Sequence, residues 1–139
     1  MPSVSVVKSI SAPADQVWAS IRQFSGIENY LPMIAKSEVE GSGVDAKRIC
    51  TTGDGAQLVE RLEALDDTKR SLSYSIAEAP MPMDGYYGTM TVRDLGGGKC
   101  EVSWSSTFEC PDGAADEMEK MLEGIYAAGI DGLEKLHGG

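Results

Sequence analysis

Residues 111–136 have the sequence PDGAADEMEKMLEGIYAAGIDGLEKL, the one long window of the chain with a clear helical period. One face of the predicted helix is apolar and the opposite face is charged. Acidic residues fill its first turns, where a helix dipole favours them, and Asp112 is the candidate N-cap. The apolar face consists of Met118, Leu122, Ile125, Gly129, Gly132, Leu133 and Leu136. The sequence therefore predicts a long helix that packs this face against an apolar surface.

Two glycines, Gly129 and Gly132, lie in the middle of the apolar face. A glycine inside a helix costs about 1 kcal/mol relative to alanine, so something else requires the space of a side chain. Either a strand or loop passes close to the helix backbone, or the space is a void for a ligand. The helix alone leaves both interpretations open.

The chain before this helix predicts a sheet that the helix can cover. Ser3–Ile10 is a β-prone run, and Pro13 suits the first turn of a short helix. The inward stripe of that helix consists of Val17, Trp18, Ile21 and Phe24. Residues 27–33 form a second short helix or an ordered loop. Residues 35–109 alternate short β-branched and aromatic runs with Gly-, Asp- and Pro-containing turns, which indicates about six more strands.

Strands joined in sequence by hairpin-sized turns form an antiparallel meander. The predicted architecture is α+β: a curved antiparallel sheet of about seven strands wrapped around a long C-terminal helix, with two short helices after the first strand. A chain of 139 residues that is 42% hydrophobic is of ordinary size and composition for one domain, so we expect residues 1–139 to form a single ligand-binding domain.

The net charge and the lack of a targeting pattern limit the partners and the location that we expect. The formal net charge is -10 and is spread along the chain, so nucleic acid and anionic membrane surfaces are unfavourable partners. The first ten residues lack the pattern of a signal peptide, and no window is long enough to span a membrane. We therefore expect a cytoplasmic protein without membrane insertion. Cys50, Cys100 and Cys110 form no C-x-x-C pair and are expected to be reduced thiols. The sequence leaves open whether the protein forms a homodimer.

Alternation along the predicted strands assigns the side chains that face the helix. The inner face comprises Leu58, Glu60, Leu62 and Ala64; Leu72, Tyr74 and Ile76; Tyr86, Gly88, Met90 and Val92; and Val102, Trp104, Ser106 and Phe108. The outer face is rich in Ser, Thr and charged residues. An apolar, aromatic wall with a few polar groups is typical of a ligand pocket. We therefore expect a small hydrophobic ligand.

In this order of elements, several short segments are similar to a known superfamily. They are Val17-Trp18 with Phe24 and Tyr30, Glu60-Arg61-Leu62 running into Leu65-Asp66-Asp67, Tyr86 before Met90-Thr91-Val92, and Val102-x-Trp104 with Phe108. The chain resembles the helix-grip, START-like (SRPBCC) superfamily over essentially its whole length. It is most similar to the bacterial polyketide cyclase/dehydrase-like proteins and more distantly similar to the plant abscisic acid receptors.

The resemblance implies a large cavity between the sheet and the last helix, with the loops at residues 53–55 and 79–84 at its mouth. In the hormone receptors these loops close over the ligand, and a lysine just after the tyrosine matching Tyr30 pairs with the ligand's acid. Leu31 occupies that position here, and the receptors' two loop sequences are absent. These departures argue against hormone recognition and against carboxylate ligands.

Glu60 is the most informative single residue. An ionised carboxylate on an apolar face is costly unless it is paired or hydrogen-bonded. A buried carboxyl group can serve as a general acid or base, and Tyr86 could supply a second proton donor for a cyclisation, dehydration or hydrolysis. The alternative is that Glu60 pairs with Arg48 or a backbone amide and only orients a ligand.

The predicted ligand-binding residues come from the sheet, the loops and the last helix. They are Leu31, Leu58, Glu60, Tyr74, Met81, Tyr86, Met90, Trp104, Ser106, Leu122, Ile125 and Gly129. The one histidine, His137, lies among terminal glycines, and the chain has neither a P-loop nor a Rossmann fingerprint. We therefore expect no metal and no cofactor.

Three functions fit these observations. The first is binding, transport or sensing of a small hydrophobic ligand in an internal cavity. The second is a polyketide cyclase/dehydratase-like enzyme with Glu60 and Tyr86 as its acid/base groups. The third is an accessory protein whose loops act on a protein partner.

Overall fold

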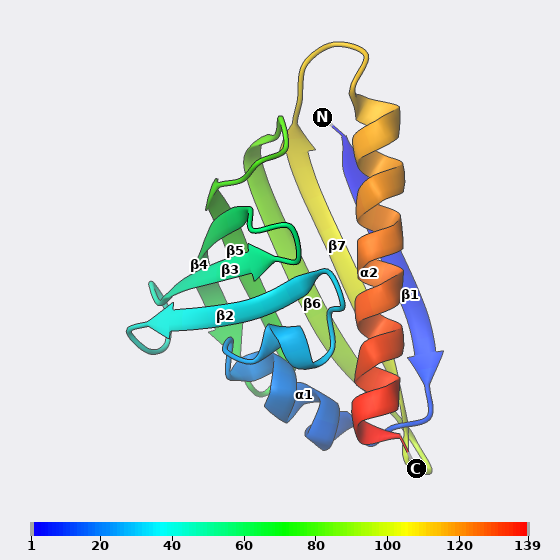
Figure 1. Cartoon of the computed structure of the whole chain (residues 1–139). Helices are drawn as coiled ribbons and strands as arrows, with labels where there is room; N and C mark the ends of the chain where they lie inside the picture. The colour runs from blue at the N-terminus through cyan, green and yellow to red at the C-terminus, as the bar shows by residue number, and fades with distance from the viewer. Residues whose placement is uncertain (1, 139) are drawn as a thin grey trace.

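The structure is a computed structural model that describes residues 2–138, and it is α+β (Figure 1). Its elements in chain order are β1 (Ser3–Ile10), α1 (Ala14–Arg22), the 3-10 helix η1 (Ile27–Asn29), β2 (Ile34–Glu40), β3 (Lys47–Thr52), β4 (Gln57–Asp66), β5 (Ser71–Glu78), β6 (Asp84–Gly96), β7 (Lys99–Glu109) and α2 (Ala115–His137). One antiparallel sheet has the strand order β1-β7-β6-β5-β4-β3-β2. The predicted meander of six strands after the first is confirmed. Within residues 2–138, no helix is long and apolar enough to cross a membrane.

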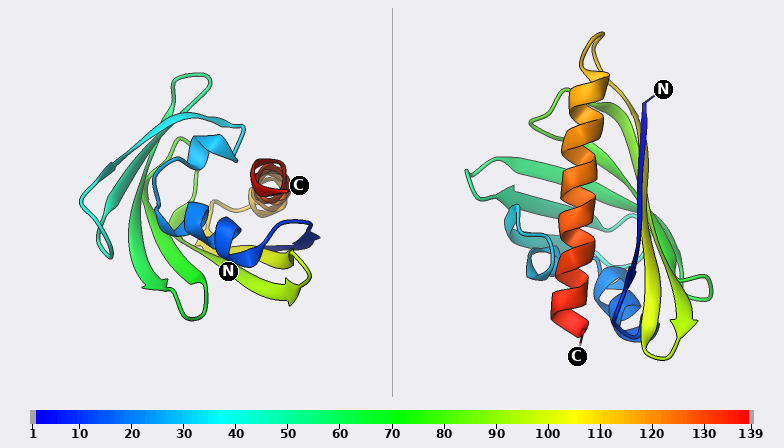
Figure 2. Two further views of the ribbon diagram at one scale, coloured as in Figure 1. Left: turned by 90° about the horizontal axis from the view of Figure 1, so that it is seen from below. Right: turned by 90° about the vertical axis from the view of Figure 1, so that its right-hand side faces the viewer.

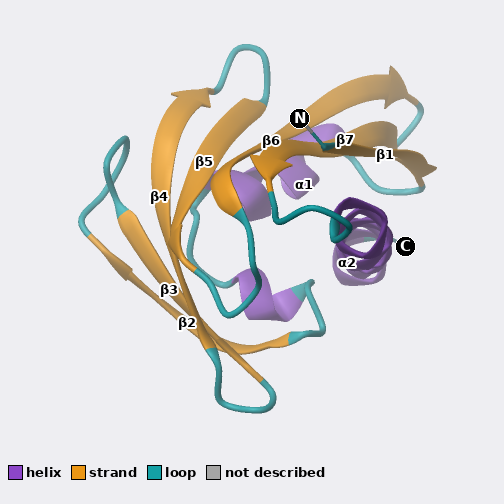
Figure 3. Ribbon diagram, turned by 90° about the horizontal axis from the view of Figure 1, so that it is seen from above, coloured by secondary structure: helices purple, strands orange, loops and turns teal. Residues whose placement is uncertain are grey.

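The sheet bends around α2, as the predicted helix-grip arrangement requires. In Figures 2 and 3 the strands curve away from the helix on one side and β1 runs beside it on the other. α1 and η1 lie at one end of the concave side, between the sheet and α2 (Figure 3). Side chains from the strands, α1, η1 and α2 together form one hydrophobic core.

The short helix α1 begins where the sequence predicts it. Pro13 precedes its first turn in an extended conformation, and the predicted stripe from Val17 to Phe24 is buried. Asp67, in the β4–β5 turn, accepts hydrogen bonds from Trp18 Nε1 at 2.9 Å and Arg22 Nε at 2.7 Å. The second predicted helix is only the three-residue η1, because Pro32 disfavours helical conformation at the residue before it.

The structure corrects three details of α2. Its N-cap is Ala114, without a side-chain hydrogen bond, so Asp112 is not the cap. Tyr126 and Ile130 are buried although they lie outside the predicted apolar face, and Leu136 is 45% exposed. The buried face is displaced because β1 also packs along the helix, so that α2 is covered from two directions (Figure 3).

Strand parity predicts the inner face of the sheet well except at the end of β4. The pairing of β4 with β5 shifts register between Leu62 and Ala64. Such a bulge reverses the alternation of the side chains that follow it. Ala64 is therefore exposed, and its neighbour Leu65 packs against the core instead.

Gly129 and Gly132 of α2 are explained by close packing and not by a void. A Cβ atom at Gly132 would lie 1.8 Å from the carbonyl oxygen of Tyr30, and one at Gly129 would lie 2.5 Å from Cζ3 of Trp104. The chain after η1 therefore passes against the helix backbone at Gly132. At Gly129 an indole ring occupies the space that a side chain would need.

Candidate ligand-binding site

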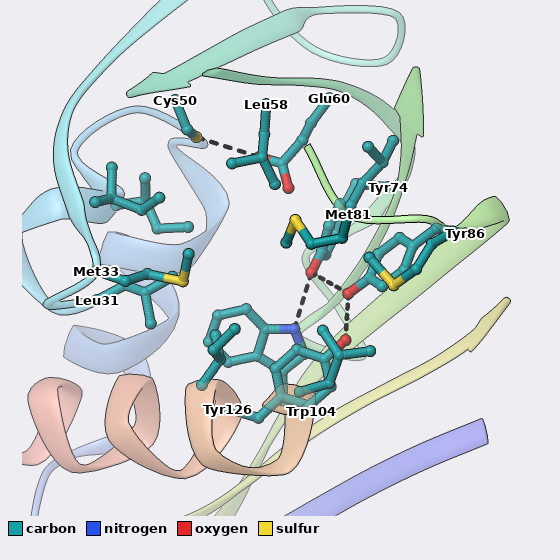
Figure 4. A pocket seen from close by; sticks show the side chains of 16 residues that line it. Leu31, Met33, Cys50, Leu58, Glu60, Tyr74, Met81, Tyr86, Trp104 and Tyr126 are labelled. Atoms are coloured by element: carbon teal, nitrogen blue, oxygen red, sulfur yellow. Dashed lines mark hydrogen bonds between the residues drawn. The ribbon is translucent and has the colours of Figure 1, made fainter. Parts of the chain in front are cut away.

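An internal cavity lies between the concave face of the sheet, η1 and the middle of α2 (Figure 4). Its walls are formed by Ile27, Leu31, Met33, Ile34, Cys50, Leu58, Glu60, Tyr74, Ile76, Met81, Met83, Tyr86, Trp104, Leu122, Ile125 and Tyr126. The open space is only about 40 Å³, room for about three water molecules. The expectation of a large cavity, which the resemblance implies, is therefore wrong for this structure. Aromatic and methionine side chains fill most of the space.

Nine of the twelve predicted ligand-binding residues line this cavity. They are Leu31, Leu58, Glu60, Tyr74, Met81, Tyr86, Trp104, Leu122 and Ile125. The other three do not line it: Met90 is buried elsewhere in the core, Ser106 is hydrogen-bonded to Tyr126, and Gly129 is covered by Trp104. Tyr126 is the main lining residue that the sequence did not identify. The pattern that could have identified it is its spacing: Tyr126 lies four residues after Leu122, on the same side of the helix.

Glu60 on β4 is buried and paired with Arg48 on β3, its cross-strand partner. Arg48 Nε donates to Glu60 Oε1 at 2.7 Å, and Cys50 Sγ donates to the same oxygen at 3.3 Å. Arg48 also donates to the carbonyl of Phe24 at 3.0 Å, and its guanidinium lies 4.0 Å from the centre of the Phe24 ring. This pairing is the alternative that the sequence left open beside an acid/base role.

The Arg48–Glu60 pair also explains the ionisation of its neighbours. Burial opposes the positive charge of Arg48, but the charge of Glu60, together with smaller contributions from Tyr30, Cys50 and the hydrogen bond to Glu60, outweighs it and raises the pKa of the guanidinium. Burial, followed by the nearby Glu60 carboxylate, raises the pKa of the Cys50 thiol to about 12. Cys50 is therefore a protonated thiol that donates to Glu60 and is not a nucleophile.

A chain of hydrogen bonds crosses the opposite wall of the cavity (Figure 4). Trp104 Nε1 donates to the Tyr74 hydroxyl at 3.0 Å, and the Tyr74 and Tyr86 hydroxyl oxygens are 2.9 Å apart. Tyr86 is in turn hydrogen-bonded to Tyr126, whose hydroxyl donates to Ser106 Oγ at 2.7 Å. Five side chains from four elements thus form one polar network in an apolar surrounding.

The backbone leaves room for these rings at one further point. Gly88 on β6 is the cross-strand partner of Tyr74, and a Cβ atom there would lie 2.7 Å from Cζ of the Tyr74 ring. The absence of a side chain at Gly88 therefore lets the ring lie flat across β6. On the other side, Trp104 and Tyr126 stack with ring centres 4.8 Å apart.

Burial changes the acidity of the network. It is the main cause that raises the pKa of Tyr126 to about 12 and the pKa values of Tyr74 and Tyr86 well above that of a free tyrosine. The Tyr86 hydroxyl is therefore a weak acid held between two other hydroxyl groups. Such a group is poorly suited to donate a proton in catalysis near neutral pH.

A second hollow, of about 310 Å³, lies at the surface where the predicted mouth loops meet. It is lined by Met33, Thr52, Gly53, Asp54, Ala56, Pro80, Met81 and Met121. Met33 and Met81 border both this hollow and the internal cavity. Flexible, polarisable methionine side chains thus lie between the cavity and the surface.

Comparison with known proteins gives the same fold and related sequences. The protein XoxI from Bacillus cereus is 30% identical, with a TM-score of 0.90 over 99% of this chain and 96% of that one. Abscisic acid receptor PYL2 from Arabidopsis thaliana is 30% identical over 127 residues, which are 84% of this chain and 67% of the receptor. The Zhui aromatase/cyclase from a Streptomyces species has a TM-score of 0.78 over 96% of this chain and 91% of that one, but it is 19% identical and shares the fold alone.

A family profile described as polyketide cyclase/dehydrase and lipid transport matches residues 1–138. The match covers every helix and strand described above, including the cavity and the two loops at its mouth. The resemblance to this group in the sequence is confirmed. The chain belongs to the polyketide cyclase/dehydrase and lipid transport family.

Proposed function

We propose that this protein binds a small, largely apolar molecule in the cavity beneath α2 and thereby carries, sequesters or senses it. The observation that supports this most directly is an apolar cavity with a paired carboxylate on its wall. A buried ion pair often adds no net stability over apolar residues of similar size, so its presence is consistent with a role in binding. A relative that is an abscisic acid receptor is consistent with a binding role.

A ligand larger than a few atoms needs more room than the cavity of about 40 Å³ offers. Met33, Met81 and Met83 are half-buried side chains on its walls, and unbranched methionine changes shape at low cost. We infer that a ligand enters between the mouth loops and displaces these side chains. The cavity then expands towards the surface hollow, while the aromatic network stays in place.

The enzymatic alternative is less well supported. Both hydrogen bonds to Glu60 from side chains in residues 2–138 end on one oxygen, and its partner Arg48 is held by Phe24 as well. Tyr86 has a raised pKa and is tied to two other tyrosines. Acid/base chemistry needs groups whose pKa values lie near the working pH and whose protons are free to move. Binding needs neither.

The proposal is tested by titrating ¹⁵N-labelled protein with 2-methylnaphthalene, a neutral apolar probe, and following amide chemical shifts. We expect saturable shifts in η1, β5 and the middle of α2. Ile125→Trp, which fills the cavity from α2, should abolish them. Val7→Trp adds the same ring on the exposed outer face of β1, where Val7 is 53% exposed, and should leave binding unchanged. Absence of saturable binding to the unmodified protein would refute the proposal.

We also propose that the protein works in the cytoplasm. Cys50, Cys100 and Cys110 are all free thiols, and Cys50 and Cys100 are buried. A reducing compartment keeps thiols in this state. Cell fractionation with detection of the protein would test this location, and recovery from an oxidising compartment would contradict it.

A further inference from the structure

The donor groups on the cavity wall are all in use. The hydrogen-bonding side chains among its lining residues are Cys50, Glu60, Tyr74, Tyr86, Trp104 and Tyr126. Cys50 donates to Glu60, and Trp104 donates to Tyr74. Whether a ligand could receive a hydrogen bond from this wall therefore depends on the three tyrosine hydroxyls.

The ends of the network fix the direction of every bond in it. The Tyr126 hydroxyl donates its single proton to Ser106, so Tyr86 has to be the donor to Tyr126. Tyr86 then has no proton for Tyr74, so Tyr74 is the donor to Tyr86. All hydroxyl protons point the same way, from Trp104 towards Ser106. A chain of this kind is strengthened by its own polarisation, and a ligand acceptor would have to break it.

The strongest unused group on the wall is an acceptor. Hydrogen bonds to Glu60 end on Oε1, and Oε2 receives none from residues 2–138. No enclosed side-chain oxygen or nitrogen in this part of the chain lacks a partner, so Oε2 borders the open space of the cavity. Figure 4 shows one Glu60 oxygen pointing into the cavity. Arg48, which could attract an anion, is not among the lining residues.

We propose that the site selects ligands with a neutral hydroxyl group, such as a phenol or an alcohol on an apolar ring system, which donates to Glu60 Oε2. The inference rests on the proposed binding function and adds the chemical class of the ligand. A hydroxyl group supplies the proton that the wall lacks, and its donor faces an acceptor of unit charge. A carboxylate would meet Oε2 with like charge and find no free donor on the lining side chains.

The ion pair also argues against a cationic ligand. Arg48 lies 2.7 Å from Glu60 and already compensates its charge. A protonated amine would bring a second, uncompensated cation into an apolar cavity, which carries a large desolvation cost. A neutral hydroxyl group gains a hydrogen bond to a charged acceptor without that cost.

The test compares probes of one shape. 2-Naphthol and 2-methylnaphthalene have the same number of non-hydrogen atoms and differ in the donor, while 2-naphthoate and 2-naphthylmethylammonium carry opposite charges. We expect 2-naphthol to bind about tenfold more tightly than 2-methylnaphthalene, as one hydrogen bond to a charged group implies, and both ions to bind more weakly than 2-naphthol. Titrations followed by amide shifts, at a pH where the naphthol is neutral, give the four dissociation constants.

Glu60→Gln provides a sharper test of the same contact. Its amide oxygen can keep the hydrogen bond from Arg48, which turns the NH₂ group towards the cavity and converts an acceptor into a donor. We expect this variant to lose the preference for 2-naphthol and to favour 2-acetylnaphthalene, which carries an acceptor. Ile76→Val, a smaller change on the same wall, should alter all affinities alike and keep the ratio of the affinities for 2-naphthol and 2-methylnaphthalene.

Each outcome is decisive for one proposal. If 2-methylnaphthalene binds as tightly as 2-naphthol, or either ion binds more tightly, the hydroxyl-donor inference is wrong while the binding function stands. If no probe binds, the binding function itself fails. The comparison in the unmodified protein decides the question even if Glu60→Gln does not fold.

Discussion

The buried pair of Arg48 and Glu60 is the residue-scale feature on which both the core and the cavity depend. Its side chains are 4% and 8% exposed, so neither charge is relieved by solvent if the other is removed. The remaining ion pairs of residues 2–138 each include a side chain at least one-quarter exposed. Removal of one partner should therefore lower stability much more at the buried pair than at the exposed pairs.

Arg48→Met is expected to lower the free energy of unfolding by about 3–5 kcal/mol, because it leaves a buried carboxylate without its cation. The double variant Arg48→Met/Glu60→Leu should recover most of this loss. Arg93→Met is the matched control: its pair with Glu101 has exposures of 67% and 26%, and its loss should stay below about 1 kcal/mol. Urea denaturation measures all three, and equal losses at Arg48 and Arg93 would contradict the argument.

The buried tyrosines predict instability in alkali. Burial raises the pKa values of Tyr30 and Tyr126 from 10.0 to about 12, so below pH 10 both states are protonated and these groups add no pH dependence. Between pH 10 and 12 the unfolded chain releases protons that the folded chain retains, and the free energy of unfolding falls. Each group contributes up to about 3 kcal/mol to this fall.

A titration followed by phenolate absorbance and by circular dichroism checks this dependence. We expect the phenolate signal of the buried tyrosines to appear together with loss of secondary structure. Tyr126→Phe should move the midpoint of the transition to higher pH. Ionisation of these tyrosines in a protein that keeps its native spectrum would show that the network is open to solvent.

At the scale of elements, the glycines of α2 record how closely the helix is gripped. Gly129 and Gly132 lie against Trp104 and the backbone of Tyr30, whereas a Cβ atom at Gly124 would meet nothing within 4 Å. The sequence established that something needs this space but not what occupies it. The answer depends on where the chain after η1 and the Trp104 ring lie, which only the folded arrangement determines.

Alanine substitutions at the three glycines are expected to act in opposite directions. Gly124→Ala should raise the free energy of unfolding by about 1 kcal/mol, through helix propensity alone. Gly129→Ala and Gly132→Ala should lower it by about 1–3 kcal/mol, with the larger effect at Gly132, because a backbone carbonyl cannot move aside as a ring can. Thermal denaturation measures the order. A stabilising Gly132→Ala would mean that the contact with Tyr30 is not maintained in solution.

In other elements too, the features set by local sequence could be predicted and those set by tertiary packing could not. Strand parity placed Glu60, Tyr74 and Trp104 on the inner face because alternation is a local property. It failed at Ala64, where a bulge added by pairing with β5 reversed the alternation. Tyr126 was missed because its burial depends on Trp104, Tyr86 and Ser106, which lie on strands distant in the sequence.

For the molecule as a whole, the size of the cavity could not be predicted from the sequence. The same inner-face residues would line a large hollow or a small one, depending on where the rings of Trp104 and Tyr126 lie. They stack on each other, and Met33 and Met81 lie between the remaining space and the surface hollow. We therefore expect these two side chains to influence access to the cavity.

Met33→Ala and Met81→Ala are therefore expected to accelerate uptake of 2-methylnaphthalene several-fold, because each removes part of the partition between cavity and surface. Met121→Ala is the control, since Met121 borders only the outer hollow. Stopped-flow measurements of probe binding give the association rates. If all three variants bind at the rate of the unmodified protein, the ligand enters by another route.

The pairing of β1 with β7 has a consequence for synthesis of the protein. Ser3 lies opposite Thr107, and β1 also packs against α2, so β1 meets its partners only after the rest of the sheet has been synthesised. Contacts between such distant segments form slowly. Until then the apolar face of the nascent sheet stays uncovered, which is the condition under which chaperones bind. Synthesis of β7 and α2 is thus the step that allows the apolar face of the sheet to be covered.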